Sequence, residues 1–544
     1  MNQFINQKEN LVTDAIDGVL EVSGGKLARL DGYPHIKVVM RNDWDKSKVA
    51  LISGGGSGHE PSHAGFVGKG MLTAAICGDV FASPAVDAVL AGILAVTGKA
   101  GCLLIVKNYT GDRLNFGLAA ERARAFGIKV EVVVVDDDVA LPDLPQPRGV
   151  AGTLFVHKIA GAAAEAGEDL ESVAKTARDV IGSIASIGMS LDTCTIPGSE
   201  KEERIEPGKA ELGLGIHGEA GVQQVPFETA KIAMDMVLDK LAEKLSSGTN
   251  VVLLNNLGST TPLEMSVLAN ELATSPKAKQ VQYIIGPAPM MTSLDMHGFS
   301  VSVMPVNENW INALNESVDM AAWPGVVEML PVVVEPLPDG LSPIQPIPSD
   351  NAKVRQIIEH CCDLLAGAEN DLNELDAKSG DGDTGSTLAT AARALKSSLD
   401  RMPLADLTQL FRAVGNELSQ TMGGSSGVIL AIFFCASGDA CANGKTTSRA
   451  LMAGLERISQ VGGADVGDRT MIDALKPALS ELPNGFEAAA SAARTGADST
   501  SKIGRARAGR SAYVPEENLI GNNDPGAEAV ARLFEGMASW VKGA

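Results

Sequence analysis

Residues 331–348 read PVVVEPLPDGLSPIQPIP, and this stretch divides the chain into two parts of different character. Six of its eighteen positions are proline. Because proline lacks a backbone N–H and clashes with the preceding helical turn, such a density prevents a helix and favours a semi-rigid extended spacer. The sequence therefore predicts a first domain over residues 1–335, a proline-rich linker over 336–350 and a second domain over 351–544.

Before the linker, short β-branched runs alternate with segments of helical periodicity. The runs predict strands at 48–53, 102–106, 130–135, 251–254, 281–285 and 301–306. Helices are predicted at 85–96, 114–126 and 227–241. Continuous apolar runs are typical of buried, mainly parallel strands in an α/β domain. Because the strands fall into two groups with a polar stretch between them, we expect two lobes that divide near residues 195–210.

After the linker, the periodicity is almost entirely helical. Helices are predicted at 354–365, 387–399, 404–420 and 527–541. Residues 428–434 have the composition of a buried strand, but their neighbours favour a helix. We therefore expect an all-α domain after the α/β domain.

Composition excludes several classes of protein. With 45% hydrophobic residues the chain is too apolar to be disordered, and its net charge of -22 disfavours binding to nucleic acid or to anionic lipid. Seven cysteines without a CxxC pair indicate neither a disulfide framework nor a zinc cluster. We find no N-terminal export signal and no run approaching 18 apolar residues, and we expect a cytoplasmic protein with no membrane partner.

The most informative motif is LDAKSGDGDTGST at residues 375–387, which crowds Asp376, Asp381 and Asp383 among glycines and hydroxyls. Carboxylates this close repel one another unless a cation neutralises them, and Mg²⁺ accepts such oxygen ligands while leaving positions for phosphates. A calcium EF-hand loop does not fit, because its sixth and twelfth positions would be Ser386 and Ala392. An ordinary turn that caps a helix beginning near Ser386 remains the alternative.

Glycine clusters occur in both parts of the chain. Residues 54–61, GGGSGHEP, follow a predicted strand and form a possible phosphate cradle, although His59 stands where a dinucleotide fingerprint needs glycine. His59 and His63 are an improbable metal pair, because Pro61 lies between them. Residues 422–427, MGGSSG, precede a helical run that can hold anionic oxygens. Residues 438–446 are no P-loop, because five residues separate the glycines.

Two further polar segments, KNYTGD at 107–112 and GLGIHGEAG at 213–221, follow strand-like or glycine-rich sequence where α/β sheets bind ligands, although ordinary turns are the alternative. Together with GGGSGHEPSHAGFVGKGM at 54–71, KNYTGDRLNFG at 107–117, GDGDTGST at 380–387 and DPGA at 524–527, they resemble the ATP-dependent dihydroxyacetone kinases over nearly the whole chain. The resemblance implies an α/β substrate domain, a helical-barrel nucleotide domain, and phosphorylation of dihydroxyacetone (glycerone) in glycerol metabolism.

The resemblance also implies roles for residues of the first domain. His217 is the position whose ring nitrogen adds to the substrate carbonyl as a hemiaminal, which fits an unprotonated imidazole as nucleophile. Asp112 is the expected general base and His59 a hydrogen-bond partner of the substrate. Further substrate contacts are expected at Gly56, Ser83 and Lys107. The glycine loop at 54 would then hold the triose and not a phosphate.

In the second domain, the resemblance implies that Asp376, Asp381 and Asp383 hold two Mg²⁺ ions that bridge the phosphates of ATP, in a reaction that depends on positioning and charge neutralisation. The expected nucleotide contacts are Thr384, Gly385, Ser386, Thr387, Ser425, Ser426, Met471, Arg510, Asp524, Pro525 and Gly526. For the locally basic Arg505 and Arg507, a solvated loop is the simpler interpretation.

The resemblance further implies a homodimer in which the nucleotide domain of one chain serves the substrate domain of the other, an exchange that the proline spacer suits. Three alternatives stay open: a kinase for another short ketose or aldose such as erythrulose or glyceraldehyde, an additional cleavage of FAD to AMP and cyclic FMN, and a non-catalytic ligand sensor.

Overall fold

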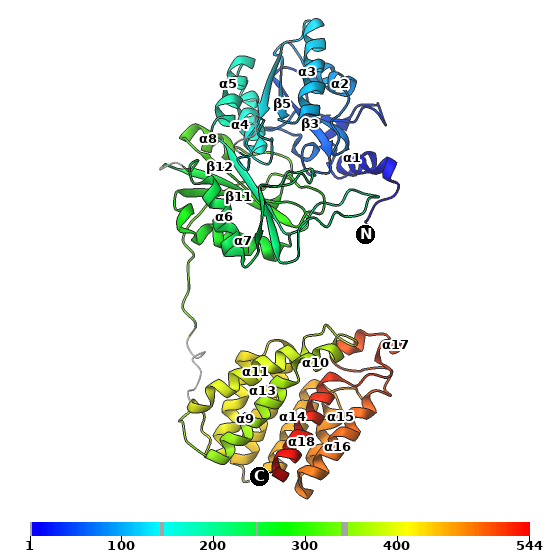
Figure 1. The fold of residues 1–544 in the computed structure, drawn as a ribbon, viewed down its shortest axis with the longest axis vertical. Coiled ribbons are helices and arrows are strands. Elements are labelled where there is room, and N and C mark those ends of the chain that lie inside the picture. The colour runs from blue at the N-terminus through cyan, green and yellow to red at the C-terminus, as the bar shows by residue number, and fades with distance from the viewer. Residues whose placement is uncertain (1–2, 142–145, 246–247, 339–345, 544) are drawn as a thin grey trace. The chain divides into compact units, whose positions relative to one another are not determined.

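The structure, a computed structural model, describes residues 3–141, 146–245, 248–338 and 346–543. The chain forms two compact units, Met1–Val334 and Glu335–Ala544 (Figure 1). The division lies at the start of the proline-rich segment, whose residues 339–345 lie outside the described part. The first unit is α/β and the second is helical, in agreement with the predicted fold class.

The first sheet of the α/β unit has six strands in the order β1-β2-β4-β3-β5-β6. Its strands are β1 (Leu27–Arg29), β2 (Val38–Arg41), β3 (Ala50–Ser57), β4 (Ala74–Val80), β5 (Cys102–Lys107) and β6 (Val130–Val135). Its helices are α1 (Leu11–Glu21), α2 (Val86–Val96), α3 (Thr110–Ala125), α4 (Thr153–Glu165) and α5 (Leu170–Ile181). Strands β4, β3, β5 and β6 run parallel, so the carboxyl ends of β3 and β5 lie at the same edge.

The second sheet has seven strands in the order β13-β11-β10-β12-β7-β8-β9. Its strands are β7 (Ala185–Ser190), β8 (Lys209–Leu212), β9 (Gln223–Pro226), β10 (Asn250–Asn256), β11 (Val281–Pro289), β12 (Gly298–Pro305) and β13 (Val326–Glu328). Its helices are α6 (Ala230–Leu241), α7 (Pro262–Thr274) and α8 (Glu308–Asn315).

Two expectations about these sheets need correction. Only β10 and β11 pair in parallel in the second sheet, so the expectation of mainly parallel strands fails there. An apolar run indicates burial of both strand faces and does not fix strand direction. The change from the first sheet to the second also occurs earlier than residues 195–210, because β7 already pairs with β12.

One hydrophobic core joins both sheets of the α/β unit. It contains Leu103 of β5, Leu154 and Phe155 of α4, and Leu253 of β10, all with 0% exposure. Helix α4 is buried on nearly every face because it packs between elements of both lobes. Loops carried by the two sheets are therefore held against each other by a shared interior that is packed like a solid.

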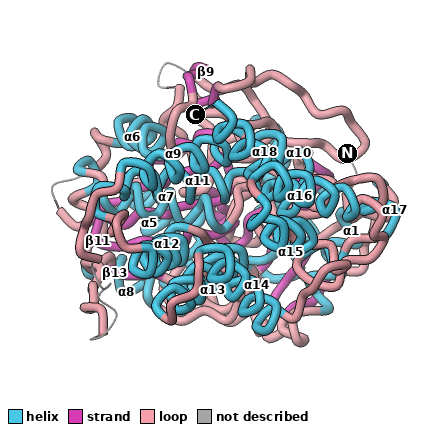
Figure 2. The backbone as a smooth tube through the Cα atoms, turned by 90° about the horizontal axis from the view of Figure 1, so that it is seen from below, coloured by secondary structure: helices cyan, strands magenta, loops and turns pink. Residues whose placement is uncertain are grey.

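The helical unit contains ten α-helices in its described part. These are α9 (Ala352–Gly367), α10 (Glu369–Asp376), α11 (Thr384–Ser398), α12 (Leu407–Thr421), α13 (Gly424–Ala442), α14 (Thr447–Gly462), α15 (Ile472–Glu481), α16 (Phe486–Thr500), α17 (Glu516–Leu519) and α18 (Pro525–Gly543). Figure 2 shows the neighbouring pairs α13 with α14 and α15 with α16 nearly end-on. Residues 428–434 lie inside α13, as the helical interpretation predicts.

Helix α13 is longer and more apolar than expected. Among the described residues it is the single helix long and apolar enough to cross a membrane, and a core helix of a globular domain passes the same test. It packs against α12 and α14 in the helical unit. Length and composition alone are weak grounds for a membrane segment, but the expectation that no run approaches 18 apolar residues is wrong.

Candidate active site

One candidate site forms in the α/β unit at the carboxyl edge of the first sheet, where open α/β sheets bind ligands. Lys107 is the last residue of β5, and Asp112 lies in the first turn of α3. His59 follows β3, which continues through Gly56 to Ser57. The predicted loop beginning at Gly54 is therefore wrong, because Gly54 and Gly55 still pair with β4.

Two of these glycines permit close approach of the backbone. A Cβ at Gly56 would lie 2.7 Å from the backbone nitrogen of Ala82. Gly55 has φ of 145°, and a Cβ there would lie 3.3 Å from Asp112 Oδ2 and 3.4 Å from Lys107 Nζ. A side chain at residue 55 would thus be strained and would enter the space beside these two charged groups.

His217 comes from the second lobe and lies within a cluster of rings. The loop that carries it follows β8, and its ring centroid lies 4.8 Å from that of His59, 4.5 Å from that of Tyr109 and 5.3 Å from that of Phe81. The structure therefore brings together His59, Tyr109 and His217, which are at least 50 positions apart in sequence.

Around these rings lie buried polar atoms that have no hydrogen-bond partner in the described structure. They are His59 Nε2, Ser83 Oγ, Lys107 Nζ, Tyr109 Oη and Asp112 Oδ1. A buried polar atom without a partner costs about 1–3 kcal/mol, so such a concentration indicates the binding site of a small polar ligand. A Cβ at Gly111 would lie 3.2 Å from Ser83 Cβ, so Ser83 lies beside the start of α3.

Hydrogen bonds fix the proton positions of both histidines. His59 Nδ1 lies 2.8 Å from the carbonyl oxygen of Thr292, which can only accept, so Nδ1 carries the proton and Nε2 the lone pair. Burial, with Lys107 and His217 nearby, lowers the pKa of His59 well below its ordinary value and keeps the ring neutral. His217 Nδ1 lies 3.0 Å from Glu219 Oε1.

Burial also shifts the pKa values of two other polar groups, Lys107 and Tyr109. It lowers the pKa of Lys107, while the carboxylates of Asp112 and Glu219 act in the opposite direction. It raises the pKa of Tyr109 well above its ordinary value, so the phenol stays protonated and can donate a hydrogen bond. The cluster thus combines two imidazoles, an amine, a carboxyl group and hydroxyl groups, which suits a small polar ligand.

A second candidate site, in the helical unit, is the aspartate loop. Asp376 is buried at the C-terminal end of α10, Asp381 is exposed in the following loop, and Asp383 precedes α11. One carboxylate oxygen from each lies within 4.8 Å of the others. All-oxygen, acidic ligands at this spacing fit a hard divalent cation such as Mg²⁺.

The backbone holds this loop in one shape. Asp376 Oδ2 accepts hydrogen bonds from the backbone nitrogens of Asp383 at 3.0 Å and Thr384 at 3.1 Å. Gly382 has φ of 78°, which favours glycine. Helix α11 begins at Thr384, and in its first turn the backbone N–H of Ser386 donates to Asn373 Oδ1 at 3.0 Å and that of Thr387 to the Asp383 carbonyl oxygen at 2.9 Å, so the helix start is tied to the aspartate loop and to α10.

Gly385 and Ser386 anchor this helix start to α10. A Cβ at Gly385 would lie 2.0 Å from the carbonyl oxygen of Glu369, so only glycine fits. The Ser386 hydroxyl accepts a hydrogen bond from Asn373 Nδ2 at 2.8 Å and donates to Glu369 Oε1 at 3.2 Å. Ser386 therefore has structural partners in addition to its predicted role.

The remaining predicted nucleotide contacts form a second group. A Cβ at Gly526 would lie 3.3 Å from Met471 Cβ, so the Asp524, Pro525 and Gly526 turn lies beside Met471. Burial raises the pKa of Asp524 to about 6, although its Oδ1 accepts a hydrogen bond from the backbone nitrogen of Ala527.

Ser425 and Ser426 lie exposed in the first turn of α13. Residues Arg510–Tyr513 form a short 3-10 helix, and the Ser511 hydroxyl donates to the Ser379 carbonyl at 3.1 Å, which links this segment to the aspartate loop. The side chain of Arg510 lies outside the described part of the structure.

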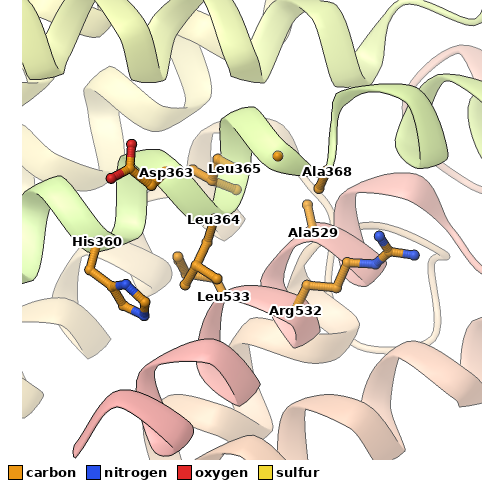
Figure 3. Close-up of a pocket in the computed structure, with 9 residues that line it drawn as sticks. His360, Asp363, Leu364, Leu365, Ala368, Ala529, Arg532 and Leu533 are labelled. Carbon is orange, nitrogen blue, oxygen red and sulfur yellow. The ribbon is translucent and has the colours of Figure 1, made fainter.

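A separate pocket of about 400 Å³ lies between α9 and α18 (Figure 3). Leu364 and Leu533 form its apolar wall, and His360 and Arg532 lie at its margin. None of the predicted site residues lines it.

Sequence reasoning missed three residues of the first cluster. Tyr109 and Glu219 stand inside the quoted motifs KNYTGD and GLGIHGEAG, but the reasoning gave them no role. Phe81 stands outside every motif, although its φ of 55° marks an unusual backbone for a bulky residue. Position within a motif was therefore a usable signal for Tyr109 and Glu219, whereas Phe81 needed the fold.

Comparisons with known proteins agree with this division of the chain. Residues 18–322 match the Dak1 domain family and residues 378–539 the DAK2 domain family. The chain is 48% identical to a dihydroxyacetone kinase of Citrobacter freundii over 98% of both proteins, and 38% identical to the human triokinase/FMN cyclase over 98% of both. It matches a crystal structure of the C. freundii kinase in complex with AMP-PNP and Mg²⁺ with a TM-score of 0.69 and 46% identity, over 99% of both chains.

Proposed function

The chain belongs to the dihydroxyacetone kinase family and is a phosphotransferase, and we propose that it transfers the γ-phosphoryl group of ATP to dihydroxyacetone. The products are ADP and dihydroxyacetone phosphate. The observation that carries this proposal is the group of unpartnered buried polar atoms around His217, in the same chain as the aspartate loop. A protein that only bound a sugar would need no aspartate loop, and a protein that only bound a cation would need no cluster around His217.

In the proposed reaction, His217 holds the substrate covalently. Its Nε2 lone pair attacks the carbonyl carbon, the π electrons move to oxygen, and that oxygen takes a proton from solvent. The ring keeps its Nδ1 proton and carries the resulting positive charge. Because the tether requires a carbonyl group, it selects ketoses and short aldoses over plain polyols and fixes the hydroxyl that reacts.

Three neighbours complete the substrate site. His59 Nε2 accepts a hydrogen bond from a substrate hydroxyl, because its lone pair faces the cluster. Asp112 acts as general base and takes the proton of the hydroxyl that is phosphorylated. Lys107 donates a hydrogen bond to a substrate oxygen, and Ser83 with the backbone of Gly56 supplies the remaining contacts.

The helical unit binds the nucleotide in this proposal. Asp376, Asp381 and Asp383 would hold two Mg²⁺ ions. Bound Mg²⁺ would supply positive charge that neutralises the phosphates during transfer. Residues at the starts of α11 and α13 contact the phosphate oxygens. Those segments comprise Thr384, Gly385, Ser386 and Thr387, and Ser425 and Ser426. Met471 and the turn at Asp524, Pro525 and Gly526 contact the nucleoside, and Arg510 contacts phosphate.

We further propose that the enzyme is a homodimer in which the helical unit of one chain serves the α/β unit of its partner. The extended, proline-rich segment between the units supports such an exchange, because it favours an open spacer over a rigid junction.

A coupled assay of ADP release tests the proposed reaction. Wild-type protein is assayed with Mg²⁺ and dihydroxyacetone, glyceraldehyde or erythrulose, and separately with FAD and Mn²⁺ for cyclic FMN. His217→Ala should lose sugar-dependent ATP turnover, whereas His297→Ala, which changes a histidine outside the ring cluster, should retain it. Full activity of His217→Ala would refute the covalent role, and absence of turnover with every sugar would favour the sensor alternative.

A further inference from the structure

The loop that carries His217 also carries a carboxylate that grips this residue at two points. Glu219 Oε1 lies 3.0 Å from His217 Nδ1, and Glu219 Oε2 accepts the backbone N–H of the same residue at 3.0 Å. The two bonds from one carboxylate fix both the position of the backbone and the rotation of the ring. Among the described histidines, His297 has a similar carboxylate contact, with Glu264 Oε1 at 2.8 Å.

The charge state of Glu219 determines which atom donates and which accepts in this contact. Burial acts to raise the pKa of Glu219, but the side-chain hydrogen bond with His217, its charge interaction with that ring and backbone hydrogen bonds outweigh burial and lower the pKa to about 2. Near neutral pH the carboxylate is ionised and only accepts hydrogen bonds. In the neutral imidazole the ring proton therefore lies on Nδ1, and the lone pair of His217 lies on Nε2.

The surrounding chain is built to keep Glu219 in place. A Cβ at Gly215 would lie 2.0 Å from Glu219 Oε2 and 2.8 Å from Arg148 Nη1, so glycine leaves the space that both groups occupy. Arg148 Nη2 donates to the Gly213 carbonyl at 2.6 Å, and Arg148 Nε donates to Asp138 Oδ2 at 2.6 Å. The loop is thus held by Arg148, which is itself bound to the buried carboxylate of Asp138.

We infer that Glu219 is a positioning residue that makes His217 Nε2 the nucleophile and balances the positive charge of the imidazole ring when the substrate is attached. The inference rests on the proposed covalent role of His217. When Nε2 attacks the carbonyl carbon, the new N–C bond leaves a cationic ring whose Nδ1–H points at the carboxylate. An opposite charge at hydrogen-bond distance favours that state over the free ketone.

Replacing Glu219 with glutamine should reverse the tautomer. The amide has one accepting oxygen and a donating NH2 group, so it cannot accept from both N–H groups of His217. With its oxygen on the backbone N–H, its NH2 group donates to Nδ1, and the ring proton moves to Nε2. The nitrogen that should attack the substrate then has no free lone pair. In serine proteases, a tautomer error of this kind lowers kcat by about 10⁴-fold.

The experiment compares wild type, Glu219→Gln, Gly215→Ala and the matched control Glu264→Gln, which neutralises a histidine-bound carboxylate on α7. Two signals are recorded on the full chain. Nitrogen-15 NMR of labelled histidine reports the His217 tautomer, with its resonances identified by their loss in His217→Ala. Carbon-13 NMR of dihydroxyacetone labelled at its carbonyl reports conversion of bound trigonal carbon to tetrahedral carbon.

We expect Glu219→Gln to move the His217 proton to Nε2, to abolish the tetrahedral carbon signal and to lower kcat/KM for dihydroxyacetone by at least about 100-fold. KM for ATP should not change. Gly215→Ala should give the same pattern, because it displaces an intact carboxylate. Glu264→Gln should match wild type.

The two proposals fail in different ways. If wild type binds dihydroxyacetone without forming a tetrahedral carbon, the covalent role of His217 is wrong. If wild type forms it and Glu219→Gln keeps both the Nδ1–H tautomer and the adduct, the role of Glu219 alone is overturned.

Discussion

The buried imidazole of His157 predicts a loss of stability in mild acid. Its side chain is 0% exposed, and neither ring nitrogen has a hydrogen-bond partner in the described structure. Burial, with a smaller contribution from Lys107, lowers the pKa of His157 from 6.5 to about 3. At pH 8 the ring is neutral in the folded and unfolded chain. Below pH 6.5 the imidazole of His157 binds a proton in the unfolded chain, whereas in the folded chain it stays neutral down to about pH 3. The free energy of unfolding therefore falls as the pH is lowered.

The size of this loss follows from the two pKa values. Between pH 8 and pH 5, the ring of the unfolded chain becomes almost fully protonated while the folded ring stays neutral. That difference lowers the free energy of unfolding by about 2 kcal/mol for this one group. His157→Leu removes the titrating group, so the variant should lose about 2 kcal/mol less than wild type over the same pH interval.

Urea unfolding followed by tryptophan fluorescence measures this difference. Three of the four tryptophans, Trp44, Trp310 and Trp323, lie in the α/β unit, and Trp540 lies in the helical unit. A Trp540→Phe background therefore confines the signal to the unit that contains His157. Each protein is unfolded at pH 8 and at pH 5, and the change in free energy is compared, so that any effect of leucine on absolute stability cancels.

The control is His35→Leu, which removes an exposed histidine. It should show the same dependence on pH as wild type. If His157→Leu and wild type lose equal stability between pH 8 and pH 5, the folded protein must bind a proton at His157 above pH 5. The argument that burial keeps this ring neutral would then be refuted.

Two further predictions concern the start of α11 and the exchange of units between chains. Gly385→Ala should lower the free energy of unfolding by about 1–3 kcal/mol and impair ATP turnover, because its Cβ would lie 2.0 Å from the Glu369 carbonyl oxygen. The control is Gly117→Ala, whose new Cβ has no atom within 4 Å and which should unfold no more easily than wild type. Equal urea midpoints for the two variants would contradict the close contact between residue 385 and the Glu369 carbonyl oxygen. If the domains exchange between chains, inactive His217→Ala and inactive Asp381→Asn should regain roughly a quarter of wild-type activity when refolded together. No recovery in the coupled assay would place both halves of the site in one chain.

Much of the fold is predictable because local signals agree with it. The run at 130–135 coincides with β6, and predicted helices at 85–96 and 227–241 lie within a few residues of α2 and α6. The clustering of the three carboxylates in the aspartate loop could also be predicted, because they lie within eight residues of sequence. Strand direction in the second sheet could not be predicted, because an apolar run indicates that a strand is buried and does not indicate which strand it pairs with.

The sequence by itself determined the change from α/β to helical structure, the clustering of three carboxylates in the aspartate loop, and the family, because these depend on composition and on residues close together in the chain. Only the tertiary structure brought His59, Tyr109 and His217 into one cluster, since their rings come from loops of two different sheets held by one core. The protonation of these groups was also decided there. Whether a nitrogen carries a proton depends on the carbonyl or carboxylate opposite it, and those partners, Thr292 and Glu219, are set by folding.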